Sequence, residues 1–165
     1  MDEQNSKPDV ELYLLRHADA GDPATFRGDD YQRPLSDKGR RQASSIGRFL
    51  SRRGFHPDTI VSSPKMRARQ TAELVAAALA TPVSLDDRLA GTPGLEQIGQ
   101  VVGDAGTRRV LLVGHDPEFS ELAAQLSGAD SVPLKKGALV RLDVSLPFAP
   151  GHGVLRWLLP PDLVG

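Results

Sequence analysis

The chain has 165 residues, which is enough for one domain with a single core but short of the usual length for two. Its 20 basic and 21 acidic residues leave a formal net charge of −1, so the overall charge gives no reason to expect a nucleic acid or an anionic membrane as a partner. The chain contains no cysteine, which excludes disulfide bonds, thiolate metal sites and a cysteine nucleophile.

The N-terminal segment MDEQNSKPD is polar and acidic and has little to bury. It lacks the basic-then-apolar order of a secretory signal, and no apolar run in the chain approaches the roughly 20 residues that cross a bilayer. We therefore expect a loose tail over residues 1–9, one domain over residues 10–165, a cytoplasmic location and no membrane partner. The sequence leaves the oligomeric state open.

Short apolar runs alternate with amphipathic segments along the first half of the domain. Residues 10–15 (VELYLL) predict a buried strand, and the irregular stretch 16–36 is longer than most loops of compact domains, which favours a functional role. Ser36 is a good N-cap for a helix over residues 37–53, which Gly54 ends. We then predict, in chain order, a strand at 59–62, a helix at 65–80 and a short strand at 83–85.

The second half continues the same alternation. We expect a weaker helix at 95–102, a strongly apolar strand at 109–113, a helix that ends at 126, and two last strands at 137–144 and 154–159. Helices that alternate with short buried strands are typical of a mostly parallel sheet covered on both faces. The predicted fold class is therefore α/β, a single domain with one such sheet and an antiparallel hairpin at its edge near the C-terminus.

Three of the predicted strands lead directly into segments rich in arginine and histidine: LLRHADA, SSPKMRARQTAE and LLVGHDPEF. Ligands of open α/β sheets gather outside the carboxyl ends of the strands, so the fold would bring four side chains to one pocket: Arg16, His17, Arg67 and His115. Guanidinium groups suit a phosphate because their planar forks pair with its oxygens and stay charged. A histidine beside two arginines should have a lowered pKa, and its neutral ring then carries a nucleophilic lone pair.

Four motifs in this order give the chain a family resemblance. The segments LRHADA, PLSDKGRRQA, SSPKMRARQTAE and VGHDPEFSELA together resemble the histidine phosphatase superfamily, which has the phosphoglycerate-mutase-like fold. The short length and the RPLS and GHDP segments are most similar to its SixA-like phosphohistidine phosphatase branch. The resemblance covers roughly residues 10–145 and implies the fold class that the pattern of elements predicts.

The resemblance also implies roles for individual residues. The phosphorylated histidine of the family falls on His17, and the arginine beside it falls on Arg16. The second arginine of the family falls on Arg67 and its second histidine on His115. Arg33, in the RPLS segment, is an expected further contact to phosphate or substrate.

The general acid does not carry over from the family. Its mutase branch places a glutamate in an inserted segment that this short chain lacks. A separate and smaller departure from the family is Ala18, which stands where the family usually has glycine after the nucleophile. Asp19, two residues beyond His17, and Glu96, in the helix after residues 93–94, are the candidate acids that the sequence offers.

The other histidines have ordinary interpretations. His56 precedes a proline and His152 lies between two glycines, so both are expected to face solvent. The four histidines lack compact ligand spacing and arginines accompany two of them, so we expect no metal and no cofactor.

The predicted function is that of a metal-independent phosphatase that forms a phosphohistidine on His17. Phosphohistidine on a protein is the substrate that the resemblance implies, and a nucleic acid is not expected. One alternative is a phosphatase of small phosphoesters such as a sugar phosphate or nucleotide. The other is a catalytically idle phosphate-binding module, although such a module would be expected to lose the nucleophile.

Overall fold

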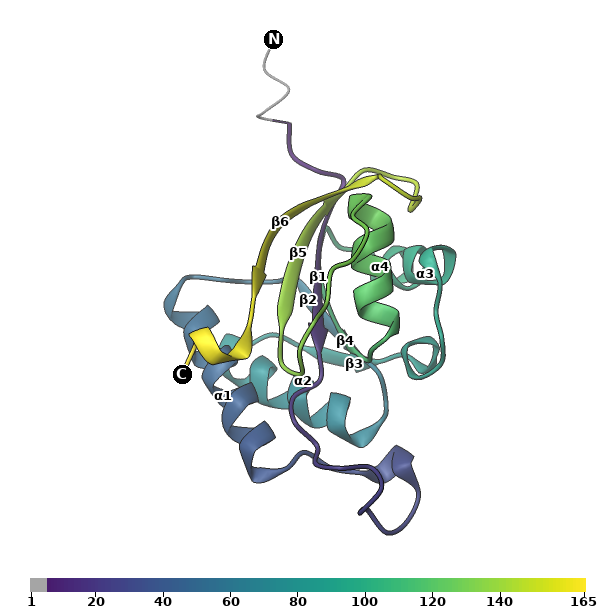
Figure 1. Cartoon of the computed structure of the whole chain (residues 1–165). Helices are drawn as coiled ribbons and strands as arrows, with labels where there is room; N and C mark the ends of the chain where they lie inside the picture. The colour runs from purple at the N-terminus through teal and green to yellow at the C-terminus, as the bar shows by residue number, and fades with distance from the viewer. Residues whose placement is uncertain (1–5) are drawn as a thin grey trace.

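A six-stranded sheet with the order β3-β2-β4-β1-β5-β6 forms the centre of the computed structural model, which describes residues 6–165 (Figure 1). The strands are β1 (Val10–Arg16), β2 (Thr59–Ser62), β3 (Val83–Leu85), β4 (Arg109–Gly114), β5 (Leu139–Val144) and β6 (Gly153–Leu159). The first four strands are parallel, whereas β5 is antiparallel to β1 and β6 is antiparallel to β5. The predicted mostly parallel sheet with an edge hairpin is confirmed.

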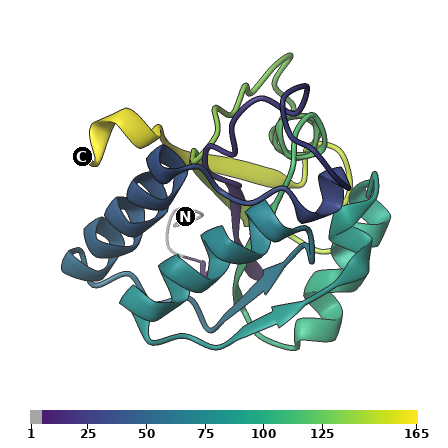
Figure 2. The same cartoon turned by 90° about the horizontal axis from the view of Figure 1, so that it is seen from below.

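Two helices cover each face of the sheet. They are α1 (Asp37–Arg52) and α2 (Met66–Leu79) on one face, and α3 (Leu95–Ala105) and α4 (Glu118–Ser127) on the other. Figure 2 shows α1 and α2 side by side on their face. The observed bounds lie within a few residues of the predicted ones, and α3 continues past residue 102 because its C-cap comes only at Gly106, which has a left-handed φ of 67°.

Strand β1 is buried on both faces, and its side chains divide the core in two. Leu12 and Leu14 pack in the cluster under α3 and α4. Tyr13 and Leu15 point the other way and pack in the cluster under α1 and α2. This alternation is the period of two that a pleated strand imposes, and it explains why the run reads as continuously apolar.

The register of the central strands places three polar segments at one edge of the sheet. Arg16 of β1 lies opposite Gly114 of β4, and the backbone N–H of His17 donates to the Gly114 carbonyl at 2.9 Å. The backbone N–H of Ser63, just after β2, donates to the Val113 carbonyl at 2.9 Å. His17, Ser63 and His115 therefore leave adjacent parallel strands at their carboxyl ends.

The loop after β1 packs directly on the first turn of α1. Ser36 is the predicted N-cap: its Oγ accepts from the Gly39 N–H at 3.0 Å and donates to Asp19 Oδ2 at 2.6 Å. A Cβ at Gly39 would lie 1.9 Å from the carbonyl oxygen of Asp19, so a side chain at this position has no room. The glycine thus permits the close approach of the loop that carries His17.

The end of the predicted tail contacts the domain. The Pro8 carbonyl accepts from Arg108 Nε at 3.0 Å, and Asp9 Oδ2 accepts from the Leu146 N–H at 2.9 Å. Residues 1–5 of that tail lie outside the described residues. Over residues 6–165, no helix combines the length and the hydropathy that a membrane span requires.

Two glycine-to-alanine substitutions in helices should have opposite effects on stability. Gly39→Ala should lower the free energy of unfolding by on the order of 1–3 kcal/mol, because the new Cβ meets backbone atoms of Asp19. Gly103→Ala, on an exposed position of α3 with nothing within 4 Å of the new Cβ, should raise it by about 0.5–1 kcal/mol. Chemical denaturation measures both, and a stabilised Gly39→Ala variant would contradict the close approach.

Candidate active site

One local hydrogen bond fixes the orientation of the His17 ring. His17 is 6% exposed, and its Nδ1 lies 2.8 Å from the carbonyl oxygen of Ala18. A carbonyl oxygen can only accept a hydrogen bond, so we assign the ring proton to Nδ1. Nε2 then carries the lone pair, and it is the atom of this ring that can attack an electrophile.

The surroundings of His17 keep its ring neutral. Burial is the largest cause and lowers the pKa of His17 from 6.5 to about 4, against the opposing effect of the Ala18 carbonyl. The positive charges of Arg67 and Arg16 lower it further. The sequence predicts the direction from these two arginines, whereas the structure shows that removal from water contributes more.

His115 lies beside His17 and is held by a serine. The two ring centroids are 5.3 Å apart, and His115 Nε2 is 2.8 Å from Ser63 Oγ. Ser63 Oγ also accepts from the Lys65 N–H at 3.2 Å, and Nε2 of His115 is the one acceptor for its proton among the described residues. We therefore assign that proton to the bond with Nε2, which leaves Nδ1 of His115 as an N–H donor. Burial first, then the neighbouring His17, lowers the pKa of His115 to about 3.

Both predicted arginines reach this end of the sheet. Arg67 is 7% exposed; its Nη1 donates to the Asp30 carbonyl at 2.9 Å, and its Nη2 lies 3.3 Å from the Asp30 carboxylate. Arg16 Nη1 donates to the Leu134 carbonyl at 2.7 Å and lies 3.7 Å from the Asp116 carboxylate. Each guanidinium is thus anchored at its outer nitrogens.

The inner polar atoms of the same residues have no partner. Among the described residues, four buried side-chain polar atoms lack a hydrogen bond, and three of them are Arg16 Nε, Arg67 Nε and His115 Nδ1. Buried donors are normally paired, because an unpaired one keeps the full loss of its hydration. Phosphoryl oxygens are acceptors that suit such N–H groups. The three donors and the neutral His17 together favour phosphoryl transfer.

Thr71 is a positioning residue that the sequence analysis did not single out. It is fully buried on α2, where its Oγ1 accepts from the Ala18 N–H at 3.1 Å and donates to the Arg67 carbonyl at 2.7 Å. It therefore ties the loop of His17 to the helix of Arg67. The motif SSPKMRARQTAE contains the signal, because a residue four positions after Arg67 lies on the same helix face.

The guanidinium group of Arg33 makes hydrogen bonds within the loop after β1. Its Nε donates to Asp30 Oδ1 at 2.8 Å, and its Nη1 donates to the Ala20 carbonyl at 2.7 Å. Asp30 in turn binds Arg67, so Arg33 holds the carboxylate that orients Arg67. We interpret Arg33 as a residue that positions Arg67 instead of the direct phosphate contact that the sequence suggests.

Neither predicted general acid has the properties of one here. The hydrogen bond from Ser36 lowers the pKa of Asp19, so this carboxyl is ionised at neutral pH and has no proton to give. Glu96 lines a groove with Phe148 of the β5–β6 turn. That turn follows Val144, which pairs with Val10 at the start of β1, so the structure does not bring Glu96 to His17.

The remaining predictions concern solvent-facing histidines and metals. His56 and His152 are exposed, as predicted. Within residues 6–165 no group of three or more histidine or acidic side chains is arranged to hold a metal ion.

Comparison with known proteins identifies a family and several relatives that the chain resembles. The family model described as the histidine phosphatase superfamily (branch 1) matches residues 12–92. An uncharacterized protein of Picosynechococcus sp. is 33% identical over 81% of this chain and 84% of its own length. Phosphohistidine phosphatase SixA of Escherichia coli is 28% identical over 92% of this chain and 94% of its own. A solved structure of the protein histidine phosphatase SixA complexed with tungstate shares the fold, with a TM-score of 0.80, 22% identity, and coverage of 94% of this chain and 100% of that one.

The substitution Arg67→Lys should strongly impair phosphoryl transfer. Lysine keeps the charge but loses the planar fork and the Nε–H donor, so kcat/KM should fall by a factor equivalent to about 2–4 kcal/mol. Arg69→Lys is the matched control, because Arg69 lies on the same helix but is exposed and pairs with Glu73. Steady-state kinetics with an aryl phosphate measures both, and equal rates for the two variants would contradict a role for Arg67.

The buried neutral histidines should make stability depend on pH. The folded-state pKa values of His17 and His115 lie below 6.5, so the unfolded chain binds more protons below that pH. The stability that they contribute is complete above about pH 6.5 and should be lost as the pH falls towards 4, by up to about 1.4 kcal/mol per pH unit for each histidine.

Denaturation curves between pH 7 and pH 4.5 test this expectation. His17→Gln should reduce the dependence on pH, because it removes one of the two groups. His152→Gln should leave it unchanged, because His152 is exposed. Identical pH dependence in His17→Gln and the unmodified protein would show that His17 is not held neutral by burial.

Proposed function

The chain belongs to the histidine phosphatase superfamily and is a phosphatase, and on that premise we propose that it hydrolyses phosphohistidine on proteins through a phosphorylated His17. The observation that carries the proposal is the state of His17. Its ring is buried and neutral, Nδ1 is bonded to the Ala18 carbonyl, and Nε2 is left as the nucleophile beside two arginines.

In the first step His17 Nε2 attacks the phosphorus in line with the leaving group. A P–N bond forms to His17, and the bond to the leaving nitrogen breaks, its electron pair returning to the imidazole of the substrate. Arg16, Arg67 and the Nδ1–H of His115 stabilise the charge on the phosphoryl oxygens, because their buried donors have no partner among the described residues.

In the second step water hydrolyses the phosphohistidine of the enzyme. The water oxygen attacks phosphorus, the P–N bond to His17 breaks, and the electron pair returns to Nε2. Inorganic phosphate leaves and the neutral His17 is restored. The lowered pKa of His17 favours the restored neutral form at neutral pH.

The ionised state of two carboxyls in the described loop after β1 supports phosphohistidine as the substrate. An alkyl phosphoester needs a proton donor, because its alkoxide is a poor leaving group. The pKa values of Asp19 and Asp30 are both lowered by hydrogen bonds, so neither keeps a proton at neutral pH. A phosphohistidine needs no such donor, because its imidazole leaves as a neutral ring once solvent has protonated its second nitrogen.

The relatives support the same substrate class. The Escherichia coli relative is named a phosphohistidine phosphatase and aligns with nearly the whole chain. The structure that shares the fold holds tungstate, an oxyanion with the tetrahedral shape of phosphate. We further propose that the reaction needs no metal, because arginine and histidine donors supply the charge that a bound cation supplies in other phosphatases.

Three substrates distinguish the proposal from its alternative. We expect kcat/KM to decrease from a phosphohistidine peptide to an aryl phosphate to a sugar phosphate, because the leaving groups need increasing help from an acid. Activity should be unchanged in EDTA. His17→Ala should abolish turnover of all three substrates and the acid-labile phosphoryl label on the protein.

Each outcome has a separate meaning. Substantial turnover by His17→Ala would refute the covalent mechanism. A preference for the sugar phosphate would identify the enzyme as a phosphatase of small phosphoesters. Loss of activity in EDTA, restored by Mg²⁺ or Zn²⁺, would refute the proposal that no metal is needed.

A further inference from the structure

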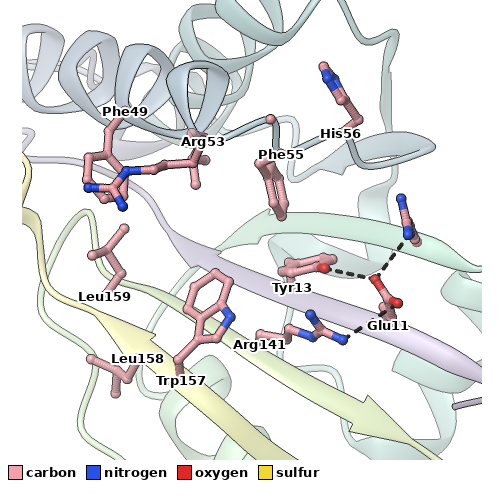
Figure 3. Close-up of a pocket in the computed structure, with 13 residues that line it drawn as sticks. Glu11, Tyr13, Phe49, Arg53, Phe55, His56, Arg141, Trp157, Leu158 and Leu159 are labelled. Carbon is pink, nitrogen blue, oxygen red and sulfur yellow. Dashed lines mark hydrogen bonds and ion pairs between the residues drawn. The ribbon is translucent and has the colours of Figure 1, made fainter. Parts of the chain in front are cut away.

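A pocket lies on the face of the sheet that α1 and α2 cover, beside the last turn of α1 (Figure 3). Its volume is about 440 Å³, and it opens between α1 and strands β1, β5 and β6. Pockets of about 300–1,000 Å³ are typical of small-molecule sites. Glu11 and Arg109, at the amino ends of β1 and β4, form one end of the pocket, whereas His17 follows the carboxyl end of β1. The pocket is therefore separate from the candidate active site.

Four aromatic rings line the pocket. Of the eight aromatic residues of the chain, four line this pocket: Tyr13, Phe49, Phe55 and Trp157. The Tyr13 and Phe55 rings meet edge to face with centroids 4.7 Å apart, and Trp157 lies 6.0 Å from Tyr13. In Figure 3 the Trp157 indole faces the gap from below, while Phe49 and Phe55 face it from above. Walls of this kind favour a flat apolar ligand.

The charged groups at the polar end of the pocket form a network of ion pairs. Glu11 is buried, accepts from the Tyr13 hydroxyl at 3.0 Å, and lies 3.2 Å from Arg109 and 3.6 Å from Arg141. Arg141 also pairs with Asp143 at 2.9 Å. Arg108 also lies 3.9 Å from Glu11, and Arg156 lies 2.7 Å from Asp143, so each arginine of this network already has a carboxylate partner.

Arg53 is the unpaired charge of the pocket. It is the C-cap of α1, and its guanidinium carbon lies 4.9 Å from the centre of the Phe49 ring. In the part of the chain that the structure describes, its side chain has no carboxylate within 4.0 Å, unlike Arg109 and Arg141. A guanidinium at the rim of an aromatic pocket attracts an anion and repels a cation.

We propose that this pocket binds a small planar aromatic carboxylate. The ring of the ligand lies between Trp157 and the phenylalanines of α1 and its following turn, and the carboxylate pairs with Arg53. The apolar area supplies affinity, and the single charged pair selects the anion over a neutral ring of the same shape.

The single tryptophan of the chain provides a direct probe. Trp157 gives the only indole N–H signal in a ¹H–¹⁵N spectrum, and a ring stacked beside it should shift that signal strongly. We expect 2-naphthoate to shift it saturably. The matched neutral probe, 2-naphthamide, has the same shape without the charge and should bind about tenfold more weakly.

Two variants test the role of Arg53. Arg53→Gln should weaken 2-naphthoate about tenfold and remove its advantage over 2-naphthamide. Arg52→Gln is the matched control: it removes the same charge one residue away, at an exposed position outside the pocket, and should leave both affinities unchanged. Arg52 and Arg53 are both exposed at the C-terminal end of α1, so neither substitution should disturb folding.

Orthovanadate, a phosphate analogue, tests whether the pocket is independent of the active site. Saturating orthovanadate should leave the affinity for 2-naphthoate unchanged. The proposal is overturned if the Trp157 signal does not shift saturably, if acid and amide bind equally, if Arg52→Gln and Arg53→Gln have the same effect, or if orthovanadate displaces the probe.

Discussion

The hydrogen bond of 2.8 Å between His17 Nδ1 and the Ala18 carbonyl decides which nitrogen of the ring is the nucleophile. The residue that accepts this bond is itself held, because the Ala18 N–H donates to Thr71 on α2. Thr71 also bonds to the carbonyl of Arg67, so the nucleophile and one of its arginines share a single support. A change in this support would move the attacking nitrogen and the phosphoryl donors together.

Burial acts in two ways on the candidate active site. It keeps His17 neutral, because an imidazolium would lose its hydration beside two arginines. It also strengthens the interaction of a phosphoryl group with those arginines, because water competes less. Asp30 and Arg33 lower the electrostatic cost of burying Arg67 at this site. Asp30 compensates the charge of Arg67, and Arg33 holds Asp30 in place. The same loop that supplies the nucleophile therefore supplies the electrostatic balance.

Helix α1 runs from the loop that carries His17 to the aromatic pocket. Its N-terminal turn contacts the loop of His17 through Ser36 and Gly39, where the Asp19 carbonyl leaves no space for a side chain. Its C-terminal end carries Phe49 and Arg53 into the aromatic pocket. The pocket lies beside this end of the helix, and Trp157 of β6 lines it from the other side.

The sequence alone determined the elements, the class of fold and the residues that gather at the carboxyl ends of the strands, because these depend on local periodicity and on short motifs. Arg16, His17, Arg67 and His115 meet for that reason. Tertiary structure decided the rest. Burial as the main cause of the low pKa of His17, the ion pair between Arg67 and Asp30, the ionised state of Asp19 and the distant place of Glu96 all depend on contacts between residues far apart in the chain. No pattern within one segment records those contacts, since each is created only when the strands and helices pack.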